Sequence, residues 1–306
     1  MSDPTTPIEI LDLLSGSDFE VAVQPPGEGT GFWAGGPSAV WHEDAFYLAY
    51  RLRRPVREGR GYANVVARST DGVHFDEVTR VTSEQFGAAS LERPALVPIG
   101  GGGWRLYVSC STRDSKHWWV ETIEADDLSD LAGGRRTVVL PGDDATAWKD
   151  IVVRQAGPDW QMWACRHPLD GGDDEADRMT SVYLTSDDGL SWTQVGTALA
   201  PTAGSWDSRG ARITSVIRSG ADWVAFYDGR ASAAENWFER TGVAIGTGPD
   251  SFTATAGPTP AGETVRYVSF AESLTGTRVY WEASRADGAN ELRTAKVPRP
   301  ASPSQS

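Results

Sequence analysis

Apolar and polar positions along the chain follow a hairpin pattern that is clearest between Ala147 and Pro168. The run from Ile151 to Arg154 is rich in β-branched residues, and the run from Trp160 to Cys165 is rich in bulky apolar residues. Between them stands Gly157-Pro158, which favours a turn because Gly accepts a positive φ and Pro presets its own φ. The pattern predicts a strand, a tight turn and a second strand.

The same hairpin plan recurs along the chain, and an aromatic residue early in its second strand marks the period. Phe46, Trp104, Trp160 and Trp223 hold this position at intervals of 58, 56 and 63 residues. The first strands of the hairpins are expected at Ser38–Trp41, Ala95–Pro98, Ile151–Arg154, Ala211–Ile217 and Tyr267–Phe270.

A third apolar run and a tight turn follow the hairpin in most units. The turns from Ser69 to Phe75 and from Ser186 to Trp192 share the pattern Ser-x-Asp-Gly and end on an aromatic residue. Ser and Asp side chains accept hydrogen bonds from their own turn, so the role predicted for both turns is structural. Five units of about four strands, at a period of roughly 50–60 residues, predict an all-β fold, namely a five-bladed β-propeller.

The texture of the sequence is even between residues 19 and 297, which predicts a single propeller domain. Residues 1–18 are expected to form an N-terminal extension, in which Pro7 to Leu14 is a short helix. The fifth unit is short of one strand. The run from Phe19 to Val23 is expected to supply it and so close the ring without an open sheet edge. The polar residues 298–306 are expected to form a flexible tail.

Charge and composition exclude several classes of function. The net charge is −14, which opposes binding to nucleic acid or to an anionic membrane surface. No apolar run reaches the length of about 18 residues that a membrane-spanning helix needs. Cys110 and Cys165 are expected to be buried free thiols in a reducing compartment, and the protein is expected to be cytoplasmic. Nothing in the sequence indicates an oligomeric state.

Charged residues gather where the predicted hairpins begin and end. In a propeller, the start of each innermost strand and the end of the following strand lie at the same end of the central channel. Long loops are expected at that end too, which makes it the expected ligand-binding face. The residues expected to bind a substrate there are Arg51, Arg93, Trp118, Lys149, Arg166, His167, Arg209, Asp228, Arg230 and Arg266.

The arginines of this face leave three interpretations open. A guanidinium group is permanently charged and binds carboxylate or phosphate through two parallel hydrogen bonds. The arginines therefore either pair only with neighbouring acids, bind an anionic ligand or phosphate, or recognise the hydroxyl groups of a neutral sugar. Trp118 either stacks on a sugar face or serves only in packing. The expected partner is a small-molecule carbohydrate or anionic ligand, with no nucleic acid and no membrane.

Two acidic residues, Glu92 and Asp150, open the innermost strands of adjacent units. Two carboxylates that face one cavity are what glycosidic cleavage needs, one as the acid and one as the base or nucleophile. Asp207 is a third candidate for a catalytic role. The alternative is that each carboxylate only orients a neighbouring Arg or Lys. No metal-ligand spacing and no cofactor-binding motif stands in the sequence, so neither a metal nor a cofactor is expected.

These motifs resemble the five-bladed propeller glycosidases, and most nearly glycoside hydrolase family 130, the β-mannoside phosphorylases and hydrolases. Tyr50-Arg51 resembles the end of that family's first blade, and Leu91-Glu92-Arg93-Pro94 resembles its Glu-Asp-Pro-Arg blade. Lys149-Asp150 with Arg166-His167-Pro168 resembles its Lys-Asp and Arg-Pro blade. The likeness extends from about Phe32 to Arg230. The family's catalytic Asp falls at Arg93, which cannot act as an acid at neutral pH.

The resemblance implies a carbohydrate-active enzyme that cleaves a glycosidic bond, by hydrolysis or phosphorolysis, in a small glycoside that is neutral or anionic. If the carboxylates of the family have moved, the candidates are Asp207, Asp228 and Glu235. The arginine in place of the catalytic Asp keeps a second hypothesis open. This is a non-hydrolytic propeller of the same scaffold, either a sugar-binding module or an enzyme recruited to another reaction.

Overall fold

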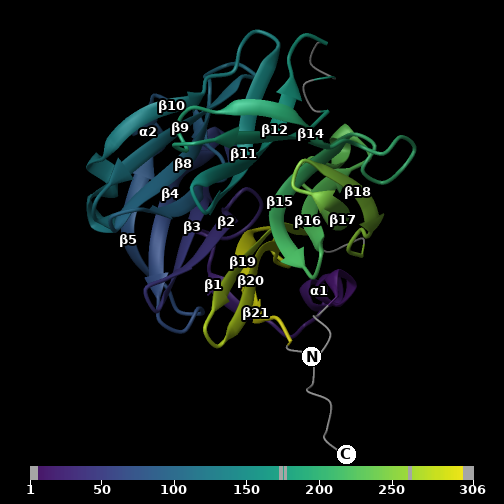
Figure 1. The fold of residues 1–306 in the computed structure, drawn as a ribbon, viewed down its shortest axis with the longest axis horizontal. Coiled ribbons are helices and arrows are strands. Elements are labelled where there is room, and N and C mark those ends of the chain that lie inside the picture. Colours follow the sequence, from purple (N-terminus) through teal and green to yellow (C-terminus); the bar gives the residue numbers. More distant parts are fainter. Residues whose placement is uncertain (1–5, 172–174, 176–177, 261–263, 299–306) are drawn as a thin grey trace, which may run out of the picture.

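Strands make up most of the regular structure, as the hairpin pattern predicts. The computed structural model describes residues 6–171, 175, 178–260 and 264–298 (Figure 1). The strands before residue 145 are β1 (Glu20–Val23), β2 (Trp33–His42), β3 (Ala45–Arg53), β4 (Gly61–Ser69), β5 (Asp76–Thr82), β6 (Ser90–Leu91), β7 (Ala95–Ile99), β8 (Gly103–Ser111), β9 (Trp118–Ala125) and β10 (Arg135–Leu140). The strands after it are β11 (Thr146–Ala156), β12 (Asp159–Pro168), β13 (Thr180–Ser186), β14 (Thr193–Leu199), β15 (Gly210–Ser219), β16 (Asp222–Arg230), β17 (Arg240–Gly248), β18 (Ser251–Ala256), β19 (Val265–Ser273), β20 (Gly276–Ser284) and β21 (Asn290–Lys296).

Strands that follow one another in the chain pair antiparallel, as hairpins do. Two sheets have the simple orders β11-β12-β13-β14 and β15-β16-β17-β18. In a third sheet, of order β10-β9-β8, the strands β6 and β7 both pair with β8, one after the other along its length. The break between β6 and β7 holds Glu92, Arg93 and Pro94, so these residues leave the regular ladder.

The two ends of the chain meet in one sheet of order β19-β20-β21-β2-β3-β4-β5. The sheet is weakly connected at its middle, because β21 and β2 share a single parallel residue pair, Trp33 with Asn290. On the other part of its length β21 pairs with β1, in a register that sets Glu20 opposite Thr294. The predicted pairing of the N-terminal strand with the last unit is therefore confirmed.

Five strands surround a central channel, and each of them is the first strand of a predicted hairpin. These are β2, β7, β11, β15 and β19; each contacts the next, and β19 contacts β2. Figure 1 shows β2, β11, β15 and β19 around the middle of the molecule. The starts of these strands and the ends of β3, β12 and β16 meet at one end of the channel.

The helix α1 (Pro7–Leu14) has the predicted bounds and a local reason to begin where it does. Thr6 and Glu9 form a reciprocal capping box, which satisfies main-chain N–H groups that the first helical turn leaves unpaired. Ile10, Leu11 and Leu14 are buried against residues of β16, β19 and β20. The described part of the N-terminal extension is therefore packed on the sheets. The tail predicted at residues 298–306 lies outside the described residues, except for Pro298.

The Ser-x-Asp-Gly turns have the structural role predicted for them. Ser69 Oγ accepts the main-chain N–H of Gly72 at 2.9 Å, and Asp71 Oδ1 accepts that of Val73 at 2.8 Å. The hydroxyl of Tyr280 donates to the Gly72 carbonyl at 2.9 Å, so the turn also links β4 to β20. The turn after β13 repeats these bonds, with Tyr107 of β8 as the donor to its glycine.

The remaining secondary structure consists of a second helix, α2 (Ser83–Phe86), and short 3-10 helices at Val56–Glu58, Leu128–Gly133 and Ala233–Glu235. None of the helices among the described residues is long and apolar enough to cross a membrane. Cys110 and Cys165 are both buried and free, as predicted. Within the described ranges, no cluster of His, Cys, Asp and Glu side chains is arranged to hold a metal ion.

Candidate functional site

A cavity of about 300 Å³ opens at the end of the channel where the strand starts and ends meet. Residues of the inner strands form its floor, and the loops after β3, β8 and β16 form its walls. Its lining side chains belong to Trp33, Arg51, Arg53, Val56, Arg60, Glu92, Ser115, Lys116, Trp118, Lys149, His167, Arg212, Arg230, Asn236, Trp237, Glu239, Arg266 and Tyr267. We call this space the rim cavity.

Positive charge dominates the rim cavity. Eight of its lining side chains are cationic and two are carboxylates, although the whole chain carries a net charge of −14. The carboxylates are Glu92 and Glu239, and the cations are Arg51, Arg53, Arg60, Lys116, Lys149, Arg212, Arg230 and Arg266. Burial and the neighbouring Arg51 lower the pKa of Arg53 to about 10, which reflects the crowding of like charges.

The inner strands β2, β11 and β19 bulge at corresponding places. In each, the pairing with the following strand shifts register, and the shifted segment holds a residue with positive φ. These residues are Gly36 (φ 60°), Asp150 (φ 51°) and Tyr267 (φ 54°). A bulge re-aims a side chain out of the regular alternation, and two of these residues, Asp150 and Tyr267, contact each other. A Cβ at Gly36 would lie 3.2 Å from Arg93, so only Gly suits this position.

Asp150 is completely buried at the floor of the rim cavity, beneath lining residues. Its Oδ2 accepts hydrogen bonds from Arg212 Nη1 at 3.2 Å and from the Tyr267 hydroxyl at 3.3 Å. Burial favours the neutral form, but the charges of Lys149 and Arg212 outweigh it and hold the pKa of Asp150 far below its ordinary value. Asp150 is therefore an ionised carboxylate that fixes Arg212 and Tyr267.

Glu239 holds together three arginines of the rim cavity. Its carboxylate pairs with Arg212 and Arg230, and it lies 3.5 Å from Nη1 of Arg266. Burial opposes its ionisation, but these three guanidinium groups lower the pKa of Glu239 below its usual range. Arg212 also donates to Asp228 at 2.9 Å, and burial raises the pKa of Asp228 to about 6 despite this partner.

Glu92 is the more accessible of the two lining carboxylates. It stands in the break between β6 and β7, where the interrupted ladder leaves its side chain 15% exposed, against 1% for Glu239. Its carboxylate pairs with Arg51 and accepts the Ser90 hydroxyl at 3.2 Å. Glu92 is therefore the lining acid with the best access to a bound molecule.

Three tryptophans give the rim cavity its apolar surfaces. The Arg53 guanidinium lies 4.3 Å from the ring centre of Trp33 and 5.1 Å from that of Trp237. On another wall, Lys149 Nζ lies 4.5 Å from the ring centre of Trp118, whose buried indole N–H has no hydrogen-bond partner. Aromatic faces beside cations and N–H donors suit a ring that carries hydroxyl and anionic groups.

The structure brings most of the predicted site residues together, but not all of them. Glu92, Arg51, Trp118, Lys149, His167, Arg230 and Arg266 line the rim cavity. Asp150 and Asp228 lie buried under its floor, each bound to the lining residues Arg212 and Tyr267.

Besides Asp150 and Asp228, four predicted residues do not line the rim cavity. Asp207 is buried elsewhere and accepts hydrogen bonds from the Tyr227 hydroxyl at 3.0 Å and the Thr202 hydroxyl at 3.2 Å. Arg93 reaches a cavity at the other end of the channel instead. Arg166 alternates along β12 with Cys165 and His167, so its side chain takes the opposite face of the sheet. Arg209 precedes β15 and is also absent from the lining.

Several residues of the site were not predicted from the sequence. Arg212 and Tyr267 stand within apolar inner strands, and a charged residue inside such a strand was the available signal. Glu239 comes from the loop before β17, far in the sequence from Arg266 and close to Arg230 only through folding. Trp33 was also missed, whereas Arg53 was expected at this end of the channel as the end of a second strand, though without an assigned role.

Comparison with known proteins gives matches by structure only. No protein-family model matches the chain, and no curated protein matches it by sequence. A glycosyl hydrolase from Bacteroides ovatus aligns with a TM-score of 0.64 at 15% identity, over 98% of this chain and 98% of its own. A thermostable family-43 glycoside hydrolase gives a TM-score of 0.68 at 13% identity, over 92% of this chain and 99% of its own.

A phosphorylase shares the fold as well. The β-1,2-mannobiose phosphorylase from Listeria innocua aligns with a TM-score of 0.60 at 15% identity, over 89% of this chain and 92% of its own. The chain therefore has the fold of the propeller glycosidases. In fold it is similar to solved structures of glycoside hydrolase families 130 and 43.

Proposed function

We propose that the protein is an enzyme that cleaves a glycosidic bond in a small anionic glycoside, or in a small glycoside with phosphate as co-substrate. The observation that carries this proposal is the rim cavity: eight cationic side chains and three tryptophans around two carboxylates, on a glycosidase fold. The protein has a net charge of −14, yet cationic side chains are concentrated at this one place. An anion bound there would neutralise them and would be held by charge-assisted hydrogen bonds.

Carbohydrate is the class of ligand that the cavity walls suit. Trp118 and Trp237 offer flat apolar faces to a sugar ring, whereas Trp33 is buried behind Arg53. The solved structures of similar fold include one with β-1,2-mannobiose bound and one with xylotriose bound. At 15% and 12% identity these are likenesses of fold, so the substrate of this chain is inferred from its own residues.

The carboxylates divide the chemistry between them. Glu92, accessible at the cavity wall, is the group that would pass a proton from the attacking water or phosphate to the oxygen of the leaving sugar. Asp150, ionised below the floor, would favour the positive charge that develops at the sugar's anomeric carbon. It also keeps the Tyr267 hydroxyl directed at itself, which places that ring at the base of the cavity. Glu239 orders the arginines that would bind the anion.

The nucleophile decides between two outcomes. In hydrolysis, water attacks the anomeric carbon, the bond to the leaving oxygen breaks, and the products are two free sugars. In phosphorolysis, an oxygen of inorganic phosphate attacks instead, and one product is a sugar phosphate. The arginine cluster around Glu239 is suited to hold phosphate in that position.

We also propose that the fold has five blades and that the protein acts in the cytoplasm. Five inner strands encircle the channel, and the large sheet divides at the single Trp33–Asn290 pair into two groups of four strands. These divisions support a count of five. Two buried free thiols favour a reducing compartment.

Product analysis tests the proposed activity. The full chain would be incubated with β-linked disaccharides, both neutral and containing a uronic acid, with and without inorganic phosphate. Free sugars and sugar phosphates would then be separated by chromatography. We expect cleavage of at least one anionic disaccharide, or phosphate-dependent cleavage of a neutral one. Glu92→Gln should lose it, whereas the exposed Glu84→Gln serves as a charge-matched control. Binding without cleavage of any disaccharide would instead support a sugar-binding module.

A further inference from the structure

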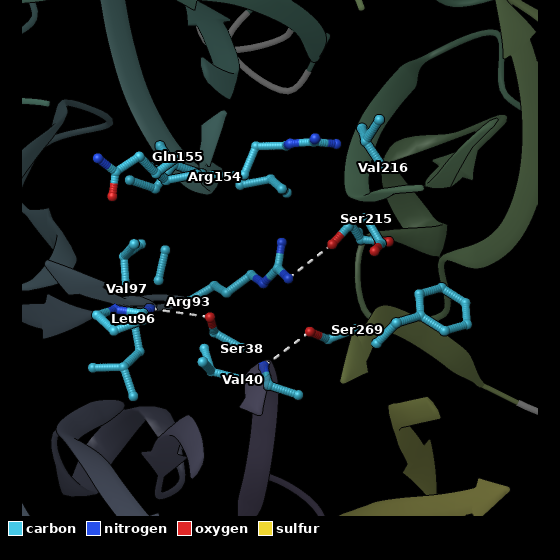
Figure 2. A pocket seen from close by; sticks show the side chains of 18 residues that line it. Ser38, Val40, Arg93, Leu96, Val97, Arg154, Gln155, Ser215, Val216 and Ser269 are labelled. Atoms are coloured by element: carbon cyan, nitrogen blue, oxygen red, sulfur yellow. Dashed lines mark hydrogen bonds between the residues drawn. The ribbon is translucent and has the colours of Figure 1, made fainter. Parts of the chain in front are cut away.

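The channel holds a second cavity at its other end, of about 440 Å³ (Figure 2). All five inner strands contribute to its lining, and Arg93 reaches it from the break between β6 and β7. Figure 2 shows the Arg93 side chain lying across the middle of this space. We call it the lower cavity; the proposed activity does not use it.

Arg93 is a buried cation, and the charges of Asp150 and Asp228 offset only part of the cost of its burial. Only 3% of the residue is exposed, and its Nη2 donates to the main-chain carbonyls of Pro37 at 3.0 Å and Thr214 at 2.8 Å. Its Nη1 is buried without a hydrogen-bond partner, and none of the described carboxylates forms an ion pair with the guanidinium. Burial lowers the pKa of Arg93 to about 10, so the group stays charged at neutral pH.

Serine hydroxyls surround the guanidinium and are set to donate. Ser38 Oγ accepts the Leu96 N–H at 3.0 Å, and Ser269 Oγ accepts the Ala39 N–H at 3.0 Å. Because main-chain donors occupy the oxygens, the hydroxyl hydrogens remain for another acceptor. Ser215 adds a third hydroxyl, and no described lining residue is acidic. The lower cavity is therefore built to receive negative charge.

The walls around these donors are apolar. Valines from four inner strands, among them Val40, Val97, Val153 and Val216, line the space together with Phe270 from the fifth. A small inorganic anion would leave these walls in contact with water, whereas an organic anion would cover them with its hydrocarbon part. The central guanidinium of Arg93, a second cation at Arg154, hydroxyl donors and apolar walls together match a carboxylate that carries an apolar group.

We propose that the lower cavity binds a small organic monocarboxylate, with its carboxylate on Arg93 Nη1 and the serine hydroxyls and its apolar part against the valines. This site is separate from the rim cavity, and it stands whether or not the protein cleaves glycosides. It also accounts for an arginine in the channel, because the ligand would bind Nη1 of Arg93, which no described group of the chain binds.

Calorimetric titration of the full chain with sodium benzoate, in a buffer free of phosphate and low in chloride, tests this site. We expect benzoate to bind wild type, and benzyl alcohol, which has the same ring without the charge, to bind far more weakly. Arg93→Gln should weaken benzoate binding roughly tenfold to a hundredfold, the range for a charge-assisted hydrogen bond. Val216→Phe fills part of the cavity while the charge of Arg93 is kept, and it should weaken benzoate binding as well.

The rim cavity is also cationic, so a matched control is needed. The double variant Arg60→Gln, Lys116→Gln removes two charges from the rim cavity alone, and it should leave this benzoate binding unchanged. Thermal unfolding checks each variant, and Val216→Phe with Ser215→Ala decides the matter if Arg93→Gln does not fold. Undetectable benzoate binding, or benzoate binding lost only in the rim double variant, would overturn the proposal. So would chloride that binds through Arg93 where benzoate does not.

Discussion

Asp150→Asn removes a buried charge and keeps the shape of the side chain. Asn adopts the left-handed conformation seen at Asp150 (φ 51°) as readily as Asp does, so the backbone contributes little to the change. What the variant loses is the ionic partner of Arg212, at 3.2 Å, and a strong acceptor for the Tyr267 hydroxyl, at 3.3 Å. Both are residues of the rim cavity floor.

The expected loss of stability follows from this geometry. Removing one partner of a buried ion pair costs about 3–5 kcal/mol. Arg212 keeps Asp228 and Glu239 as partners, so we expect the lower end of that range. With an unfolding entropy of about 2.1 cal/mol/K per residue, a loss of about 3 kcal/mol lowers the Tm by roughly 5 °C. Turnover per folded molecule should fall about 100-fold, which is about 2.7 kcal/mol.

The difference in stability between wild type and Asp150→Asn should become smaller at low pH. The folded-state pKa of Asp150 is depressed, so its contribution to stability is present above the unfolded pKa of about 3.9. That contribution is lost as the pH falls further, toward the folded-state pKa. The Tm values of wild type and variant should therefore differ by the full amount at pH 5–7 and by less at pH 3.

Asp207→Asn is the matched control, because Asp207 is equally buried but lies outside both cavities. It should lose stability while its turnover per folded molecule stays near that of wild type. The reasoning is refuted if Asp150→Asn is as stable as wild type at pH 7, or if its activity per folded molecule is unchanged.

Three further predictions concern other parts of the molecule. Deleting residues 1–24 removes β1 and three buried side chains of α1, so it should destabilise the fold by roughly 5 kcal/mol; an unchanged Tm would contradict this packing. The raised pKa of Asp228, about 6, means that its burial costs stability as the pH rises from about 4 to 6. Asp228→Asn should not lose stability over this pH range, and Tm values that change with pH in parallel for variant and wild type would refute this prediction. Because burial raises the pKa of Cys165 to about 12 and that of Cys110 well above its usual value, a thiol reagent should label neither cysteine until urea is added; rapid labelling of the native protein would contradict their burial.

Local rules predicted much of the fold. The capping residues Thr6 and Glu9 and the Ser-x-Asp-Gly turns satisfy their own neighbours, so their structure could be derived from a few adjacent residues. The pairing of Glu20–Val23 with the last unit followed from counting strands and from the cost of an open edge. The meeting of charged residues at one end of the channel followed from the hairpin pattern alone.

The direction of individual side chains could not be derived in this way. Arg93 and Glu92 are adjacent, yet they serve opposite ends of the channel, because the ladder is broken there and Gly36 leaves room for the arginine. Asp207 turns to Tyr227 rather than to the rim cavity. Glu239 meets Arg212 and Arg230 through the pairing of β15, β16 and β17 in one sheet, and it meets Arg266 because β19 packs beside that sheet.

The proposal that the rim cavity binds an anionic glycoside, or phosphate, is best tested by comparing an anionic with a neutral substrate. We would measure kcat/KM for a uronic acid glycoside and for its uncharged parent sugar, in wild type and in Arg53→Gln, with and without phosphate. We expect wild type to cleave the uronic acid glycoside roughly tenfold or more faster than the uncharged one, or to require phosphate for cleavage. Arg53→Gln should reduce this preference for the charged glycoside or this requirement for phosphate. Equal rates on both glycosides without phosphate, unaffected by Arg53→Gln, would contradict it.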